Sequence, residues 1–97
     1  MDAKERHERT LARTLGELIP QLKDPRIPVV VTVERVRLNA DFSRAKVLIS
    51  TLSEDDLPDF EAALERACGF LQRELAATLD LRRTPRLIFT SNPLEVL

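Results

Sequence analysis

The chain has 97 residues, 43% of them hydrophobic and 32% charged, which suits one small domain with a modest core. Its formal net charge of −1 excludes a generic polybasic nucleic-acid binder, so any nucleic-acid contact must use a local patch of cations. A single cysteine excludes an internal disulfide, and together with the single histidine it argues against a protein-only zinc site.

The N-terminal segment, MDAKERHERT, is charged and precedes no apolar run. We therefore expect neither a signal peptide nor a membrane span, and we expect a cytoplasmic protein.

The chain begins with a pattern typical of a helix, predicted from about Ala3 to Leu22. Its buried stripe follows from leucines spaced three and four apart: Leu11, Leu15, Leu18 and Leu22. Pro20 predicts a distorted or early-ending last turn. The following segment, Asp24-Pro25-Arg26, most simply ends the helix and sets the entry angle of the next strand, and Arg26 is also a candidate contact residue.

Two strands are predicted next, at Val29–Leu38 and Arg44–Leu52, joined by turn residues at 39–43. In the first strand the apolar residues change phase, which predicts a β-bulge near Glu34-Arg35. We expect an antiparallel hairpin with one face packed and one face wet. The second strand should then direct Arg44 and Lys46 outward.

A second helix is predicted from Leu57 to Leu79, with Ser53, Asp55 or Asp56 as its cap. The small residues Ala67-Cys68-Gly69 interrupt it, and glycine costs about 1 kcal/mol there relative to alanine. We predict a broken helix that either bends at this point or lets another backbone come close.

Arg86–Thr90 is the third predicted strand, and the last four residues are predicted to form a short tail. The chain is therefore predicted to be one domain, 1–97, with an ordered core of about 3–91. Its elements suit an α+β fold in which helices cover one face of a three-stranded sheet.

Four segments carry a family likeness: DPR at 24–26, AKV at 45–47, ACGFL at 67–71 and LRRTPRLIF at 81–89. In this order and spacing the chain resembles the bacterial ribosome-binding factor A family over nearly its whole length. The resemblance implies a type-II KH-like domain with the order α-β-β-α(kink)α-β. An Ala-x-Gly kink stands in it where KH domains carry Gly-x-x-Gly. The sequence ends soon after the third strand, whereas many members carry an extended C-terminal tail.

The resemblance also implies a function. Members bind the small (30S) ribosomal subunit, contact its 16S rRNA and assist late maturation, including processing of the rRNA 5′ end, and some are linked to growth in the cold. On this basis we expect a ribosome assembly factor that is not an enzyme, needs no cofactor or metal, contacts no membrane and is monomeric when free.

The candidate RNA-binding residues are cations and the small residues of the kink: Arg26, Arg35, Arg37, Arg44, Lys46, Ala67, Cys68, Gly69, Arg73, Arg82, Arg83 and Arg86. Phosphate contact by Arg82, Arg83 and Arg86 is favoured chiefly by the family resemblance, and these arginines also flank a rigid Thr84-Pro85 connection. The alternative for these arginines is a solvated surface. For the kink it is a packing role alone.

Other interpretations stay open at this stage. The acidic residues between Glu54 and Glu61 suit helix capping rather than a catalytic dyad. Cys68 is expected to be a small filler, with His7 only a remote candidate as a basic partner. The rival functions are a generic KH-like module for single-stranded RNA, which the missing Gly-x-x-Gly and stacking aromatics disfavour, and a protein-interaction domain that dimerises through its sheet.

Overall fold

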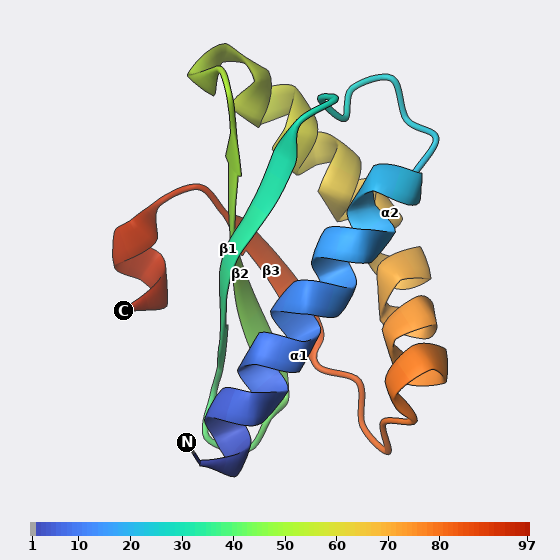
Figure 1. Ribbon diagram of the computed structural model, residues 1–97, viewed down its shortest axis with the longest axis vertical. Helices are drawn as coiled ribbons and strands as arrows, with labels where there is room; N and C mark the ends of the chain where they lie inside the picture. Colours follow the sequence, from blue (N-terminus) through green and yellow to red (C-terminus); the bar gives the residue numbers. More distant parts are fainter. Residues whose placement is uncertain (1) are drawn as a thin grey trace.

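Two helices cover one face of a three-stranded sheet in the computed structural model, which describes residues 2–97 (Figure 1). The main elements are α1 (Ala3–Leu18), β1 (Val31–Leu38), β2 (Arg44–Thr51), α2 (Leu57–Leu79) and β3 (Arg86–Thr90). Short 3₁₀ turns lie at Ile19–Gln21, Glu54–Asp56 and Pro93–Val96. This arrangement confirms the predicted α+β fold.

The first helix is fixed at both ends by local chemistry. Asp2 caps it, since its Oδ1 accepts a hydrogen bond from the Glu5 N–H at 2.8 Å. The helix ends at Leu18 and continues as a 3₁₀ turn that contains Pro20. The predicted distortion of the last turn is therefore confirmed, and Leu11 and Leu15 are buried as the leucine spacing predicted.

The sheet has the order β1-β2-β3, with β1 antiparallel to β2. Their register shifts between Val33 and Arg35, which confirms the predicted bulge. The inward residues of β2, Ala45 and Val47 among them, are fully buried. β3 pairs in parallel with β2, so α2 serves as the crossover connection that a parallel pair requires.

The second helix is continuous over its 23 residues, so the predicted break is wrong, whereas the predicted bend agrees with its change of direction in Figure 1. Its buried face includes Phe60, Leu64, Leu71 and Leu75. The helical hydrogen bonding tolerates Gly69, which is exposed and keeps negative φ. In Figure 1 the first half of α2 (yellow) runs diagonally and the second half (orange) runs more steeply, so the helix changes direction near its middle without interruption. A Cβ built on Gly69 would meet only the Arg73 side chain, at 3.4 Å, so no other backbone approaches closely there.

A buried carboxylate connects α1 to the sheet. Glu8 is 6% exposed, and its Oε2 accepts a hydrogen bond from the Leu38 N–H at 2.7 Å. Its Oε1 lies 3.7 Å from Nη1 of Arg37. A charged group at this depth is tolerated because both of its oxygens have partners.

The C-terminal residues differ from the predicted tail. Pro93–Val96 forms a 3₁₀ turn whose Val96 side chain is buried. The Val96 carbonyl accepts a hydrogen bond from Nε of Arg37 at 3.0 Å. The segment thus covers part of the sheet face that the helices leave open, and it lies opposite them in Figure 1.

Candidate nucleic-acid interface

The predicted contact residues lie on two sides of the molecule. Gly69 and Arg73 are on the exposed surface of α2, whereas Arg35, Arg44 and Lys46 are exposed on the strands. In both strands the buried residues alternate with these cations, so the strand cations face away from the helices. The twelve residues therefore do not form one patch.

The kink residues sit where α2 meets β3. Cys68 is half-buried, and its single S–H lies within hydrogen-bonding distance of two acceptors, Oε1 of Gln72 at 3.1 Å and the Leu87 carbonyl at 3.7 Å. Ala67 packs beside it against the core. Beside this junction a shallow groove of about 310 Å³ is lined by Gly69, Gln72, Arg73, Ala76 and Thr84. The small residues thus bring α2 close to β3 and leave Gly69 and Arg73 accessible.

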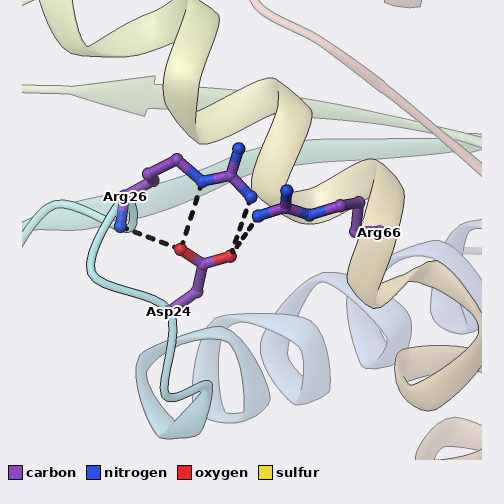
Figure 2. A network of polar contacts seen from close by, with 3 residues as sticks. All are labelled: Asp24, Arg26 and Arg66. Atoms are coloured by element: carbon purple, nitrogen blue, oxygen red, sulfur yellow. Dashed lines mark hydrogen bonds and ion pairs between the residues drawn. The ribbon is translucent and has the colours of Figure 1, made fainter.

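The structure adds a cation that the sequence interpretation missed. Figure 2 shows Arg26 and Arg66 converging on the carboxylate of Asp24. Arg66 Nη2 lies 3.0 Å from Asp24 Oδ2, and Arg26 Nη2 lies 3.2 Å from the same oxygen. Arg66 precedes Gly69 and Arg73 by three and seven residues, so all three share one face of α2. That spacing was the signal available in the sequence.

Asp24 also fixes the connection between α1 and β1. Its Oδ1 accepts hydrogen bonds from the Arg26 backbone N–H at 2.9 Å and from Nε of Arg26 at 3.3 Å. The backbone hydrogen bond is the largest cause that lowers the pKa of Asp24, and the Arg26 side chain lowers this pKa further. The structural role expected for Asp24-Pro25-Arg26 matches this geometry.

These contacts predict a pH dependence of stability. Because the folded-state pKa of Asp24 lies below the unfolded value of about 3.9, the carboxylate stabilises the fold above that pH, and this contribution is lost as pH falls through the folded pKa. We expect Asp24→Asn to reduce the free energy of unfolding at pH 7 and to flatten its decline below about pH 4. Denaturant unfolding between pH 7 and pH 2 measures both effects.

Asp55→Asn is the matched control, since it removes an exposed carboxylate outside this network with the same change in net charge. If the free energy of unfolding falls with decreasing pH as steeply in Asp24→Asn as in the control, the network contributes nothing to acid unfolding.

The arginines after α2 are held on a fixed backbone. Asp80 ends the helix with a left-handed φ of 51°, and the Leu81 N–H bonds back to the Ala76 carbonyl at 3.3 Å. Pro85 is buried, and the Arg86 N–H bonds to the Ser43 carbonyl at 2.8 Å. Arg82 and Arg83 between these anchors are both exposed. Their side chains project from a braced loop rather than from a free one.

The strand cations form the second group. Arg44 pairs with Arg86 and Arg37 pairs with Lys46 in the sheet register, so these residues are neighbours on the open face. Arg37 is tied to Glu8 and to the Val96 carbonyl, which directs its guanidinium to internal contacts. A groove of about 430 Å³ lies beside it, lined by Arg44, Lys46 and Ile88 together with Glu95 of the C-terminal turn.

The described residues, 2–97, hold no group of three or more His, Cys, Asp or Glu side chains placed to bind a metal ion. Over the same range, no helix is long and apolar enough to cross a membrane. His7 packs edge-on against Phe42, with ring centroids 5.6 Å apart, whereas the hydrogen bonds of Cys68 go to Gln72 and Leu87. The structure therefore gives no support to a Cys68–His7 pair.

A helix-covered sheet with this element order, and with Ala-x-Gly in place of Gly-x-x-Gly, defines a type-II KH-like domain. Residues 3–93 match the family model for ribosome-binding factor A. The chain belongs to the ribosome-binding factor A family.

Relatives and solved structures agree with this assignment. The chain is 40% identical over 78 residues to ribosome-binding factor A of Dechloromonas aromatica, covering 79% of this chain and 63% of that protein. It is 37% identical over 93 residues to the Rubrobacter xylanophilus protein, covering 95% and 76%. The chain thus spans less than two thirds of the length of the first relative.

The crystal structure of ribosome-binding factor A from Thermus thermophilus matches with a TM-score of 0.82 and 38% identity, covering 92% of this chain and 96% of that one. A Thermus thermophilus model, fitted into the cryo-electron-microscopy map of a complex between 30S and ribosome-binding factor A, matches with a TM-score of 0.72 and 39% identity, covering 84% and 87%.

Proposed function

We propose that this protein binds the small ribosomal subunit through its 16S rRNA and assists late maturation of that subunit in the cytoplasm, including processing of the rRNA 5′ end. Family membership supports this proposal, as does the similarity to a Thermus protein fitted into a 30S complex. The single observation that carries it is the set of exposed arginines on α2 and on the braced loop that follows it.

The proposed contact surface consists of Arg66, Gly69, Arg73, Arg82 and Arg83. Guanidinium groups hydrogen-bond phosphate oxygens, and such contacts position a protein on RNA without reading its sequence. Gly69 leaves room for an RNA backbone because no side chain projects from it. The surface carries local positive charge although the whole chain has a net charge of −1.

The mechanism is stoichiometric rather than catalytic. The domain binds one conformation of the immature rRNA more tightly than others, and it thereby shifts the population toward that conformation. The domain is proposed to recognise the shape of folded rRNA, because only the folded subunit places the phosphates where all of the arginines can contact them. The factor leaves when maturation removes the preferred conformation.

Co-sedimentation with purified precursor and mature small subunits tests this function. We expect the protein to pellet with subunits and to bind short single-stranded RNA more weakly. With four arginines at phosphates, the slope of log K against log salt should be about −3. Equal affinity for the single strands would favour a generic KH-like module. Absence of pelleting together with self-association in sedimentation would favour an interaction domain.

Gly69→Ala separates the stability cost of the glycine from its role in binding. Alanine should stabilise α2 by about 0.5–1 kcal/mol, since the added Cβ meets only the flexible Arg73 side chain. The same Cβ should weaken subunit binding several-fold because it occupies the surface that the RNA backbone approaches. Thermal unfolding and co-sedimentation measure the two effects.

Gly16→Ala is the matched control. Gly16 is also exposed within a helix, and a Cβ built on it meets nothing within 4 Å. We expect Gly16→Ala to stabilise the protein by a similar amount and to leave subunit binding unchanged. If Gly69→Ala binds subunits as well as Gly16→Ala does, the glycine serves only the helix.

A further inference from the structure

A groove of about 580 Å³ shares Arg82 and Arg83 with the proposed contact surface and extends from them away from Gly69 and Arg73. It opens between the N-terminal half of α1, the β1–β2 turn and the loop after α2. Its floor is apolar, with Leu11, Leu38, Leu79 and Leu81 among the lining residues. A groove of this size with few polar groups is typical of sites that bury a small molecule or one unit of a polymer.

Two rings line this groove. His7 comes from α1 and Phe42 from the turn, and the rings meet edge to face at an interplanar angle of 68°. Phe42 has a positive φ of 62°, a conformation that costs about 1–2 kcal/mol for a residue with a Cβ. The turn maintains it through hydrogen bonds from Phe42 N–H to the Asn39 carbonyl at 3.1 Å and from Arg44 N–H to Asn39 Oδ1 at 2.9 Å.

Charged groups of both signs complete the groove. Arg82 and Arg83 line the side formed by the loop, and Asp41 lines the side formed by the turn. Asp41 Oδ1 accepts hydrogen bonds from Ser43 Oγ at 2.6 Å and from Ser43 N–H at 3.1 Å, so its other oxygen is not used by these bonds. The Ser43 hydrogen bonds chiefly lower the pKa of Asp41, and Arg83 adds to that effect, which keeps the carboxylate an acceptor.

We infer that this groove binds one unpaired nucleotide of RNA, with its base against the His7 and Phe42 rings and its phosphate at Arg82 and Arg83. Aromatic side chains stack on unpaired bases, guanidinium groups hold phosphates, and a carboxylate accepts from an exocyclic amine. The charge pattern favours a nucleotide over an acidic or a purely apolar protein segment. The inference rests on the proposed function, because it makes the groove a second RNA contact beside α2.

Nuclear magnetic resonance titration of the full chain with adenosine 5′-monophosphate tests the inference, with ribose 5-phosphate as the probe that lacks a base. His7 is the only histidine, so its ring signals are identified directly. We expect saturable shifts of the His7 and Phe42 ring signals with the nucleotide and much smaller shifts with the sugar phosphate. Equal shifts with both probes would show that the groove binds only the phosphate, and would overturn the inference. The absence of shifts with both probes would also overturn it.

Variants at Phe42 provide a second test of the inference, by the same titration. Phe42→Leu should weaken nucleotide binding at least about fivefold, the lower end expected for the loss of one base–aromatic stack. Phe42→Tyr should restore binding, which separates stacking from any loss of folding. Phe70→Leu, the same change at an exposed phenylalanine of α2, is the control and should bind like the wild type. Unchanged affinity in Phe42→Leu would overturn the inference.

Co-sedimentation of the same proteins with small subunits keeps the two proposals distinguishable. Wild-type pelleting without any nucleotide response at His7 and Phe42 overturns the groove inference alone. A nucleotide response without pelleting overturns the proposed function alone. Ring signals that respond to subunits, but to neither small molecule nor a short single-stranded RNA, would show that the groove does not bind an unpaired nucleotide and would overturn the inference.

Discussion

Reversing the charge of Arg82 and Arg83 together should weaken binding to the small ribosomal subunit by about 10- to 100-fold. Both side chains are exposed on a loop that is fixed by the Leu81 and Arg86 backbone hydrogen bonds. Arg82→Glu/Arg83→Glu removes two phosphate contacts and places two carboxylates beside the RNA backbone. The slope of log K against log salt should fall in magnitude by about 1.5. Co-sedimentation over a range of salt concentrations measures both quantities.

Arg9→Glu/Arg13→Glu is the matched control for this experiment. Arg9 and Arg13 are exposed on α1, and each arginine-to-glutamate change lowers the net charge by two, so both double variants move it from −1 to −5. Net charge acting at long range would weaken the two variants equally. A local contact weakens only the loop variant. Wild-type affinity in Arg82→Glu/Arg83→Glu would remove this loop from the interface.

Glu8→Ala should lower the free energy of unfolding by about 2–3 kcal/mol, the largest stability effect that we predict. The change leaves the buried Leu38 N–H without its acceptor and Arg37 without its carboxylate partner. For a domain of this size, the loss corresponds to a fall of about 10–20 °C in Tm. Thermal and denaturant unfolding measure it directly.

Two further variants define the origin of that loss. Glu17→Ala removes an exposed glutamate from the same helix and should change stability by less than about 0.5 kcal/mol. Glu8→Gln keeps an oxygen that accepts from the Leu38 N–H, so it should be less destabilised than Glu8→Ala. If Glu8→Gln and Glu8→Ala unfold alike, the ion pair with Arg37 rather than the hydrogen bond supports the junction.

Local periodicity was enough to predict the five main elements, although α1 ends at Leu18 rather than Leu22 and β1 begins at Val31 rather than Val29. The phase change from Val33 to Val36 predicted the bulge, and Pro20 predicted where α1 stops being α-helical. The bounds of α2 and β3 were also predicted correctly, because leucine spacing and nearby prolines mark them. These signals depend only on neighbouring residues, which is why the sequence carried them.

Features that depend on distant residues were not predicted. The parallel pairing of β3 with β2 is set by packing of the whole chain. The left-handed Asp80 that turns the chain toward Arg82 has no glycine to mark it. Gly69 was expected to break α2, but side-chain packing on both sides of it outweighs an intrinsic cost of about 1 kcal/mol. Tertiary contacts therefore determine the pairing of β3, the end of α2 and the continuity of α2.

For the candidate site, the sequence predicted which way single side chains face better than how those side chains are grouped. Alternation in β1 and β2 placed the strand cations outward, and the helices lie on the other face, so one continuous patch was excluded by the predicted architecture itself. Arg66 was missed although its spacing from Gly69 and Arg73 was visible in the sequence, and its contact with Asp24, 42 residues earlier, becomes visible only in the fold. The groove at Phe42 likewise joins segments that are far apart in the sequence.

β3 has a neighbour on one side only, and that neighbour is the central strand β2. A peripheral strand of five residues detaches at less cost than the entire domain unfolds, so sub-global opening is expected to begin there. Its first residue, Arg86, immediately follows the loop that carries Arg82 and Arg83. A ligand that binds this loop only while β3 is paired with β2 therefore suppresses the opening of β3 by mass action. Binding at the loop then makes this edge of the sheet more rigid.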